Sequence, residues 1–550
     1  MPMLRPLARA SVLLGAILST AAVAADAPGE TTLPSDAELE AAHAHIGKIE
    51  VHTVQVFDLS DPKDDNWIFR TADDLHKRTR DSAIRAQLLF RSGDPYSRRL
   101  LDETARNIRL NSSFLREPLI RPIRYHDGLV DIEVITHDVW TLQPGVDFSR
   151  SGGTNSIGVD FADANFLGFG KYAEIGHEET VDRTSNFVRW QDPNVWGTHW
   201  VDGAVFSKNS DGTIWQLAGG LPFYSLEARN AAGVDFGDVH STVTRYRLGQ
   251  AYDAYSLSDH AGDLFIGKAI IVSDAWTERV LLGWRVDDAN FSPAPGQIPL
   301  APLPQDRNLS YPFVRTQWVQ NRFDTMRNLD LIARTEDVHF GLDASVGLGW
   351  ATPAFGADRH SLLADSEINY GWRFAESEEL FLTSRLASRF EAGSMRDAIA
   401  TWGASYYLAT SDMTRFLARF TGDAGRNLDG DHTLQLGGDT GLRGYPLRYQ
   451  NGNQRALFTL EERLYTNWYL FRLFNVGAAA FYDMGRTWGT TLVPTPQLGL
   501  LKDAGIGLRL GNARSSFGSV IHVDLAFPLD RTSTVPINSV QFLVTTEQSF

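Results

Sequence analysis

One arginine and two carboxylates stand where a folded chain could join them as ion pairs. Arg443 lies in the segment 437–445, which reads Gly-Gly-Asp-Thr-Gly-Leu-Arg-Gly-Tyr, and Glu461 and Asp483 lie in two segments that follow. Glycines permit a tight loop, and a guanidinium can bind a carboxylate through two parallel hydrogen bonds. These residue types therefore suit a clamp that pins a loop, which is binding chemistry rather than catalysis.

The two following segments, 456–464 and 481–485, alternate polar and apolar residues as half-buried strands do. In the first, the alternation puts Glu461 and Arg463 on one face and leaves Glu462 on the other. Charges are tolerated on the luminal side of a barrel but not on its lipid side, so luminal charges should come in opposite pairs. We expect a polar interior to receive Glu461, Arg463, Phe481, Asp483 and Gly485.

The chain from residue 143 to residue 550 is a series of short alternating segments separated by Gly, Asp and Asn turns. Aromatic residues are abundant, with 14 Trp, 16 Tyr and 31 Phe. Transmembrane barrels need aromatic girdles, and their alternation keeps the overall hydropathy ordinary, as the mean hydropathy of -0.21 is here. At ~25 residues for each strand with its connection, we expect an all-β transmembrane barrel of about 16 antiparallel strands over 143–550.

The C-terminal segment distinguishes a barrel from a soluble β-sandwich, which would alternate in the same way. Val540, Phe542 and Val544 share one face with Phe550. A terminal aromatic residue preceded by alternating apolar positions resembles the recognition signal of outer-membrane barrels. We therefore expect a barrel, with these four residues as its targeting signal.

The N-terminal residues predict export. Arg5 and Arg9 precede the apolar run 10–22, and the small residues Ala-Val-Ala end at residue 24. This pattern indicates a secretory signal peptide over 1–24, because the run is too short for the alternative, a retained anchor helix. Residues 25–46 show no sustained pattern and are expected to be a linker; whether they plug the barrel stays open.

Residues 47–142 carry the signals of a small α/β unit with the order β-α-α-β-β. Residues 49–56 alternate as a strand, and helix formers with apolar residues at helical spacing fill 71–90 and 98–110. Two further strands, 119–125 and 129–140, surround the turn Asp127-Gly128. We expect this unit to precede the barrel as a separate domain.

Composition excludes several functions. The net charge is -16, so a nucleic-acid partner is not expected, and the absence of cysteine removes disulfides, thiolate metal sites and cysteine nucleophiles. Some outer-membrane barrels are hydrolases, but no nucleophile elbow, zinc-protease helix or phosphate-binding loop motif occurs. We expect no catalytic residues, no metal and no cofactor.

Several motifs together resemble one superfamily, which contains BamA, TamA and the two-partner secretion transporters. The segment Leu442-Arg443-Gly444-Tyr445 is similar to its Arg-Gly-Tyr/Phe loop motif, and the E-x-R segment at Glu461 and the F-x-D-x-G segment at Phe481 match the strands that follow it. Residues 165–170, Asn-Phe-Leu-Gly-Phe-Gly, resemble the entrance to the second barrel strand. Residues 92–97 and 127–140 resemble a polypeptide-transport-associated domain.

The resemblance implies the fold and the function. It implies an outer-membrane protein whose N-terminal domain lies in the periplasm and binds unfolded polypeptide clients, and whose barrel inserts them into the membrane or passes them across it. Arg443 would lie in the sixth extracellular loop and pair with Asp483 and Glu461. A lateral opening between the first and last strands, near Val146 and residues 540–550, is the implied route.

Alternatives remain open at this stage. A passive outer-membrane channel would have the same barrel, and a two-partner secretion transporter would serve one passenger. The N-terminal domain could be only a spacer. The implied partners are unfolded outer-membrane or secreted polypeptides and the lipid bilayer, with periplasmic chaperones or accessory lipoproteins as further candidates. The identity of the client is not legible.

Overall fold

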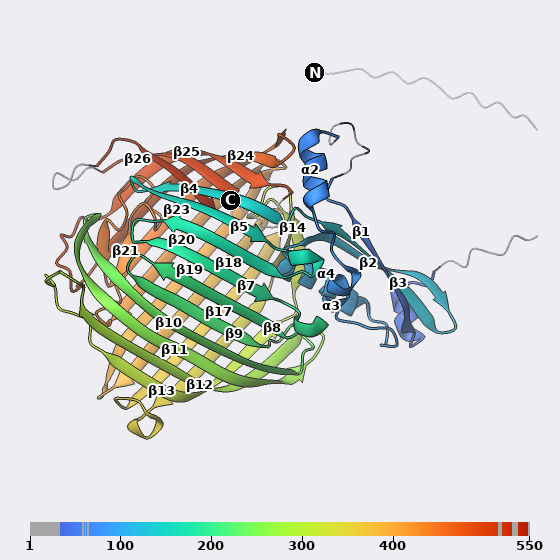
Figure 1. The fold of residues 1–550 in the computed structure, drawn as a ribbon, viewed down its shortest axis with the longest axis horizontal. Helices are drawn as coiled ribbons and strands as arrows, with labels where there is room; N and C mark the ends of the chain where they lie inside the picture. The colour runs from blue at the N-terminus through green and yellow to red at the C-terminus, as the bar shows by residue number, and fades with distance from the viewer. Residues whose placement is uncertain are drawn as a thin grey trace, which may run out of the picture.

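The computed structural model describes residues 33–57, 60, 62, 65–514, 520–530 and 537–547 (Figure 1). The predicted signal segment 1–24 and the predicted targeting residue Phe550 lie outside the described residues. The described chain has two parts, a small N-terminal α/β unit and a large β-barrel.

The N-terminal unit is built around a three-stranded sheet with the order β1-β3-β2, in which β3 pairs parallel with β1 and antiparallel with β2. Its core contains fully buried Leu101 and Ile108 from α4 and Ile132 and Val134 from β3. None of the described helices is long and apolar enough to cross a membrane. The elements are α1 (Asp36–Ala41), β1 (His45–Val54), α2 (Trp67–Leu75), α3 (Asp81–Ala86), α4 (Arg98–Asn111), β2 (Leu115–His126) and β3 (Leu129–Asp138).

The single helix predicted over 71–90 is wrong, because α2 and α3 are separate helices. The Asn66 side chain caps α2 by accepting a hydrogen bond from the Phe69 amide. The connection between the helices is extended at Arg80, whose amide donates to the Gly168 carbonyl oxygen of the barrel at 3.0 Å. A contact with the barrel thus interrupts a sequence that local propensity alone would make helical.

The barrel is closed and consists of 20 strands, each paired antiparallel with its neighbours. The expectation of an antiparallel barrel is confirmed, and the predicted number of 16 strands is wrong. The strands are β4 (Leu142–Ser151), β5 (Thr154–Asp163), β6 (Tyr172–Glu179), β7 (Thr184–Asp192), β8 (Val201–Asn209), β9 (Gly212–Leu221), β10 (Asn230–Arg247), β11 (Gln250–Val272), β12 (Trp276–Pro293), β13 (Arg307–Gln320), β16 (Leu342–Ala351), β17 (Ser361–Ala375), β18 (Glu378–Glu391), β19 (Ser394–Ser411), β20 (Thr414–Arg426), β23 (Gln454–Leu470), β24 (Phe474–Trp488), β25 (Leu501–Asn512), β26 (Val520–Pro528) and β27 (Gln541–Glu547).

Short connections explain the larger number of strands. The connections 210–211, 248–249 and 392–393 each contain two residues. Because the 20 strands occupy residues 142–547, each strand with its connection takes about 20 residues rather than the ~25 assumed from known barrels. Tight hairpins therefore leave room for four more strands.

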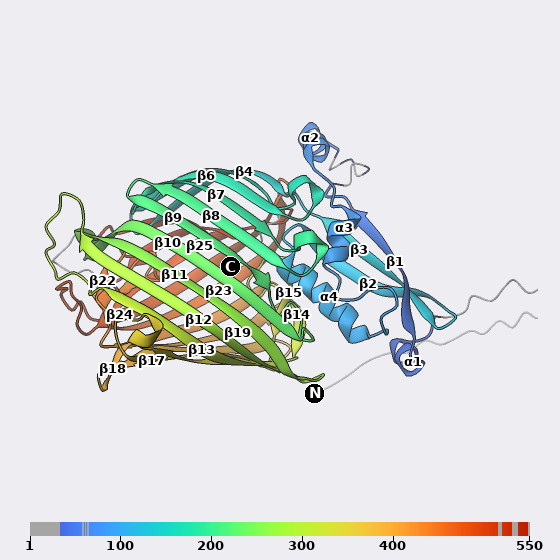
Figure 2. The same cartoon turned by 60° about the horizontal axis from the view of Figure 1, so that its bottom comes forward.

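The N-terminal unit lies against one end of the barrel in both views (Figures 1 and 2). We call this the domain end and the opposite one the loop end. Two small sheets lie outside the barrel wall: the hairpin of β14 (Phe323–Arg327) and β15 (Thr335–His339) at the domain end, and the pair β21 (Leu434–Leu436) and β22 (Gln450–Gly452) in the long connection 427–453 at the loop end. Short 3-10 turns complete the fold: η1 (Phe166–Gly168), η2 (Val195–Gly197) and η3 (Pro353–Phe355).

The outer face of the barrel is apolar around its circumference. Exposed large apolar side chains occur on strands far apart in the sequence, among them Val159 on β5, Leu264 on β11, Leu382 on β18 and Ile506 on β25. In a protein surrounded by water these residues would be hidden in a core. Charged residues are instead buried on the inner face, which is the reverse of a soluble protein and typical of a barrel that crosses a bilayer.

Candidate functional site

The long connection 427–453 folds back into the lumen between β20 and β23. Leu442 and Tyr445 are fully buried there, together with Leu436, Tyr449 and Leu501. The Tyr445 hydroxyl donates to the carbonyl oxygen of Lys502 at 2.8 Å, and so joins the loop to the wall at β25. We call residues 427–453 the lumen loop.

The lumen loop is the eighth loop at its end of the barrel, so its predicted position as the sixth is wrong. The reason is the number of strands. In a barrel of 16 strands the sixth loop is the third from the C-terminal end, and the lumen loop is also the third from that end among 20 strands. The four additional strands therefore precede the lumen loop.

Arg443 lies at the centre of the site and is held by two carboxylates. Its Nε and Nη2 atoms donate to the two oxygens of Asp483 at 2.7 and 3.0 Å, and its Nη1 donates to Glu461 Oε2 at 3.1 Å. The guanidinium carbon lies 3.4 Å from the centre of the Phe481 ring, which adds a cation-π contact. The Thr459 hydroxyl donates to Asp483 at 2.8 Å and fixes that carboxylate.

Close approach of the loop to the wall requires glycine at the flanking positions. Gly441 has φ +107°, a conformation that other residues rarely adopt. A Cβ on Gly444 would lie 2.6 Å from Cβ of Asp503, and a Cβ on Gly485 would lie 2.7 Å from Leu436. Gly444 and Gly485 thus provide the space in which Arg443 reaches its carboxylates.

The alternation of residues 456–464 matches the geometry. Glu461 and Arg463 point inward and are almost fully buried, and Glu462 is exposed on the outer face. The Glu462 carboxylate accepts a hydrogen bond from Thr410, next to the turn 412–413 at the domain end, so this outward charge lies at the rim of the barrel. A carboxylate at the rim remains hydrated, whereas one in the middle of the outer face would not.

The ion network is larger than the sequence reasoning predicted. Asp524 on β26 lies 3.6 Å from Arg443, and it forms an ion pair with Arg509 on β25. Both side chains are buried, as is Asp503, which stands opposite Asp483 across β24 and β25. The sequence does indicate that Arg509 and Asp524 point inward, because the alternation of 505–510 and 520–527 places them on the polar face of their strands.

The barrel closes through a minimal contact between its last and first strands. Within the described residues, β27 registers with β4 only at Val544 and Arg150. The neighbouring strand pairs are longer. β26 pairs with β27 at every position from Val520 to Ala526, and β4 pairs with β5 along its whole length. We call the β27–β4 contact the seam.

The lumen loop bridges the two sides of the seam from inside. Its Arg443 and Tyr445 hold the C-terminal strands, whereas its Arg448 donates to both oxygens of Asp182 in the β6–β7 turn at 2.8 and 2.6 Å. A Cβ on Gly438 would lie 2.7 Å from the backbone nitrogen of Gly152 in the β4–β5 turn. The loop therefore ties strands that the seam joins only weakly.

Of the predicted targeting residues, Phe542 and Val544 lie on the last strand and Val540 lies next to it. Val540 and Phe542 are exposed, Val544 is half-buried, and Phe542 lies on the outer face of β27. Inward residues of the same strand, Gln541 and Leu543, are buried.

A hairpin at the domain end, which sequence reasoning missed, enters the lumen. Residues 321–341 connect β13 to β16 and contain β14 and β15. Ile332 is 2 % exposed and packs against Tyr465 and Val520 of the wall. The Arg463 Nη1 donates to the carbonyl oxygen of Leu329 at 2.7 Å, so the same arginine contacts Glu461 and the hairpin. We call 321–341 the plug hairpin.

The N-terminal unit is docked on the plug hairpin and on the turns of the domain end. Arg109 of α4 binds both oxygens of Asp337 at 2.5 and 2.6 Å. The Asn165 side chain donates to Thr79 at 2.8 Å, and the Asn194 side chain donates to the Ala86 carbonyl oxygen at 3.1 Å. The segment 165–170 lies between the second and third strands, not at the entrance to the second strand as the resemblance implied.

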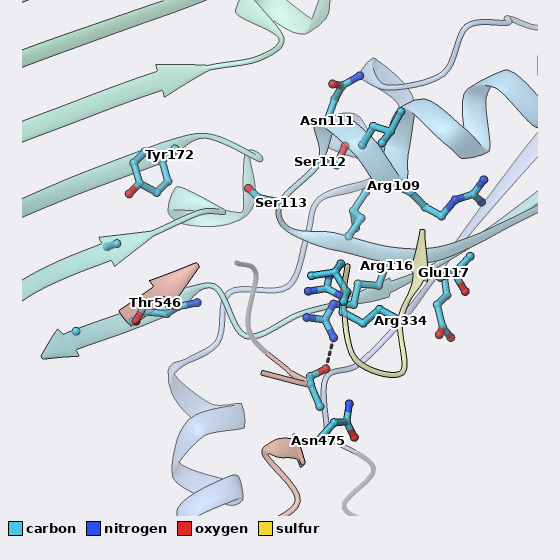
Figure 3. A pocket seen from close by; sticks show the side chains of 18 of the residues that line it. Arg109, Asn111, Ser112, Ser113, Arg116, Glu117, Tyr172, Arg334, Asn475 and Thr546 are labelled. Carbon is cyan, nitrogen blue, oxygen red and sulfur yellow. Dashed lines mark hydrogen bonds between the residues drawn. The ribbon is translucent and has the colours of Figure 1, made fainter. Parts of the chain in front are cut away.

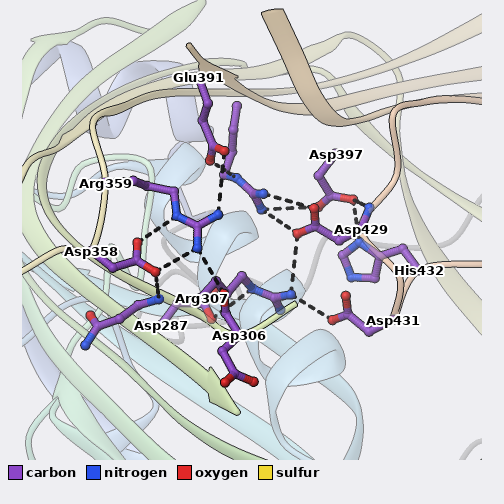
Figure 4. Close-up of polar contacts among 12 residues, drawn as sticks. Asp287, Asp306, Arg307, Asp358, Arg359, Glu391, Asp397, Asp429, Asp431 and His432 are labelled. Carbon is purple, nitrogen blue, oxygen red and sulfur yellow. Dashed lines mark hydrogen bonds and ion pairs between the residues drawn. The ribbon is translucent and has the colours of Figure 1, made fainter. Parts of the chain in front are cut away.

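A second polar network holds the beginning of the lumen loop at the loop end (Figure 4). Arg307 Nη1 lies 2.8 Å from Asp431, and Arg389 Nη1 lies 2.9 Å from Asp429. His432 Nδ1 lies 2.7 Å from Asp397, and this hydrogen bond raises the pKa of His432 above its usual value. Within the part of the chain that the structure describes, no group of His, Cys, Asp and Glu is arranged to hold a metal ion.

Comparison with known proteins gives only distant likenesses. No family model matches the chain, and no curated protein matches its sequence. Among solved structures, CdiB from Acinetobacter baumannii is 12% identical over 92% of this chain and 74% of its own, with a TM-score of 0.47. BamA from Haemophilus ducreyi lacking POTRA domains 1-3 is 15% identical over 91% and 85%, with a TM-score of 0.38. CdiB from Escherichia coli is 13% identical over 91% and 76%, with a TM-score of 0.47.

Proposed function

We propose that this chain is an outer-membrane factor of Gram-negative type that inserts β-barrel clients into the membrane or translocates polypeptides across it. The observation that carries the proposal is the seam. Among the described residues, the first and last strands pair at Val544 and Arg150 alone. A barrel joined there so weakly would expose strand edges when it opens, and an exposed edge can template a new strand. The clamped lumen loop, which contacts both sides of the seam, would control that opening.

The outer face supports a place in the membrane. The apolar band of exposed side chains is suited to lipid, and aromatic residues at the domain-end turns, such as Trp196 and Phe471, are strongly exposed, as interface anchors are. The lipid bilayer is thus one partner. Unfolded polypeptides are the other, with periplasmic chaperones or accessory lipoproteins as further candidates.

The N-terminal unit is proposed to lie in the periplasm and to act as a polypeptide-transport-associated domain. Clients would bind by adding a strand to an edge of its sheet. The central position of β3 leaves β1 and β2 as edges, and β2 contains Pro118 and Pro122, which lack the amide that a ladder needs. The edge of β1 therefore offers the better template, although Arg85 already donates to its Ile49 carbonyl oxygen at 3.0 Å.

The passive-channel alternative fits the interior less well. The lumen loop enters from one end and the plug hairpin from the other, and Leu442, Tyr445 and Ile332 are buried against the wall. A diffusion pore needs an open water-filled path, whereas this lumen is occupied at both ends.

Reconstitution separates the two functions. The purified protein is placed in liposomes, and an unfolded outer-membrane barrel is added while its acquisition of protease protection is followed. We expect folding to be faster than in empty liposomes, and the protein in a planar bilayer to conduct little. A steady large conductance combined with no acceleration of folding would support the passive channel instead.

A further inference from the structure

A groove of about 580 Å³ lies on the outer face of the C-terminal strands β23 to β27. We call it the outer groove. Apart from one carboxylate, the side chains that cross it are apolar. One row of cross-strand neighbours leads through it from β23 to the last strand: Glu462, Ala480, Ile506, Leu525 and Phe542.

Small side chains form the floor of the outer groove. Ala478 of β24 is the cross-strand neighbour of Leu464 on one side and of Leu508 on the other, and both leucines are exposed. Ala480 follows on the same face of β24 and is exposed as well. Methyl groups between leucines leave a furrow, in which a hydrocarbon chain gains more van der Waals contacts than on a flat wall.

Glu462 is the one charged residue among the described residues that line the groove. It is exposed beside the domain-end turn 412–413, and its cross-strand neighbours Phe416 and Ala480 carry no charge. Nowhere in the described chain does a Lys, Arg or His come within ion-pair distance of it. A carboxylate at the border of an apolar band is stabilised by a cation that joins it there.

Other charges at the domain end already have partners. In and around the large polar cavity beside the N-terminal unit (Figure 3), Arg109 binds Asp337, and Arg116 donates to the carbonyl oxygen of Ala513. Glu462 therefore stands out as a charge that faces the lipid side and that the chain itself does not neutralise.

Hydroxyl groups lie next to Glu462 at the rim. The Thr410 hydroxyl donates to Glu462 Oε1 at 3.2 Å, and the hydroxyls of Thr410 and Thr414 lie 2.7 Å apart. Ser411 Oγ lies 2.7 Å from the same Thr414 hydroxyl. Because a hydroxyl proton can rotate, these groups can donate to a phosphate oxygen beside the carboxylate.

The outer groove has a polar end at the rim and an apolar end deeper in the lipid-facing band. Glu462 lies beside a domain-end turn, whereas Phe542 lies near the start of β27, a strand whose Thr546 reaches the domain-end cavity. The tilt of barrel strands makes a row of neighbours move along the barrel axis as it crosses them. A molecule whose headgroup lies at Glu462 thus directs its chain into the band.

We propose that the outer groove binds a phospholipid with a primary-ammonium headgroup, taken from the leaflet at the domain end. Glu462 binds the ammonium, the hydroxyls of Thr410 and Thr414 face the phosphate, and an acyl chain lies over Ala478 and Ala480. A primary ammonium brings three N–H donors to the carboxylate, whereas a quaternary amine brings none and an anionic headgroup is repelled. The inference goes beyond the proposed function, since it needs a barrel in a bilayer but not an opening of the seam.

Native mass spectrometry of the full-length protein tests the site. The protein in detergent micelles is mixed with equal amounts of phosphatidylethanolamine, phosphatidylcholine and phosphatidylglycerol that carry the same acyl chains, and the lipid that stays bound is identified by its mass. We expect phosphatidylethanolamine to be retained about threefold more than either of the others, the ratio that an exposed charge pair gives.

Matched variants separate the headgroup from the chain. Glu462→Gln should abolish the preference and keep the total retention, whereas Ala480→Leu, which fills the floor, should lower the retention of all three lipids. The control is Glu378→Gln. Glu378 begins β18 at the domain end on the same face as exposed Leu382, outside the outer groove, so its replacement should preserve the preference. Heat-modifiable mobility on a gel checks that each barrel has formed.

Four outcomes would overturn the site. They are equal retention of the three headgroups by the wild-type protein, a preference that survives in Glu462→Gln, a preference lost equally in Glu378→Gln, and unchanged retention by Ala480→Leu. A dimer of the wild-type protein that Ala480→Leu dissociates would show that the groove holds a second copy of the chain, and would also overturn the proposal.

Discussion

Among single residues, Arg443 does the most to fix the site, because it joins strands from one half of the barrel to a loop that reaches the other half. Its guanidinium fills its hydrogen-bonding fork with Asp483 and Glu461. Glu461 also pairs with Arg463 at 3.0 Å, whereas Arg443 is the one ion-pair partner of Asp483 among the described residues. The pair is thus partly a structural necessity, since either partner alone would leave a buried charge.

Replacement of Arg443 by alanine should weaken the barrel without preventing its insertion. Loss of the guanidinium strands the buried carboxylate of Asp483, and removal of one partner from such a pair costs ~3–5 kcal/mol. We expect a lower temperature for the heat-modifiable shift on gels and slower client folding in liposomes. Arg486→Ala, an exposed arginine on the same β24, is the control and should change neither. Full activity at normal thermal stability would show that the clamp has no role.

His432 gives the loop end a pH dependence. Its hydrogen bond to Asp397 raises its pKa, and the other charged groups that face it are Asp431 and Arg307. A raised pKa means that the folded state favours the protonated form, so the stabilisation is fully present below the ordinary value of ~6.5 and is lost as pH rises through the raised value.

The His432 prediction is checked by thermal unfolding between about pH 6 and about pH 9, a range in which histidine titrates. The unfolding midpoint of the wild-type protein should fall more steeply with rising pH than that of His432→Gln. Parallel profiles for the two proteins would contradict the proposed tether. The control His177→Gln replaces an exposed histidine, hydrogen-bonded to Asn186, that lies outside the loop-end network, and so tests whether the effect is specific to His432.

The sequence was sufficient to place the inward residues of the site, but not to complete it. Alternation fixes which face a residue occupies, and so it put Glu461, Arg463 and Asp483 on the inner face. It does not say which strands are neighbours across the barrel, so it could not bring Arg509 and Asp524 to the same ion network. That information lies in the register between strands.

Among the elements, the plug hairpin connects the N-terminal unit with the interior of the barrel. Its one side holds Arg109 of the N-terminal unit through Asp337, and its other side holds Arg463 of the lumen through the Leu329 carbonyl oxygen. Under the proposed function, a client that moves the N-terminal unit would therefore pull on an element inside the barrel. These contacts form a continuous path through which a movement of the N-terminal unit can reach the lumen.

Removal of the plug hairpin should open the lumen. Replacement of residues 323–339 by a short Gly-Ser turn removes the side chains that pack on the wall near Tyr465 and Tyr407. We expect a several-fold larger single-channel conductance in planar bilayers. Deletion of the exposed residues 295–298 at the loop end is the control. Unchanged conductance after removal of the hairpin would mean that it does not occlude the path.

The sequence predicted the type of most elements and missed their number. Period-two alternation identifies strands reliably, but the length of a turn leaves little trace when two residues such as Leu248-Gly249 suffice. The plug hairpin was missed for a related reason. Its strands β14 and β15 alternate like wall strands, and only their short length and their contacts with the lumen distinguish them.

In the whole molecule, long strand pairings close the barrel wall everywhere except at the seam, where the described pairing is short. Most neighbouring strands are paired along long registers, whereas β27 and β4 meet at one residue pair among the described residues. The ties that compensate for this joint come from inside, through the lumen loop. Under the proposed function, the barrel would open at this place while the remaining wall stays closed, as insertion or lateral release of a client requires.

The most direct measurement is client folding by a protein whose seam can be locked. The chain has no cysteine, so Arg150→Cys with Val544→Cys introduces a disulfide across the seam that a reductant reverses, and Leu525→Cys with Phe542→Cys places the control bond between β26 and β27. In liposomes, the seam-locked protein should lose its acceleration of client folding when oxidised and regain it when reduced, while the control pair stays active in both states. Equal folding rates for the oxidised and reduced seam would contradict the proposal that the barrel acts by opening there.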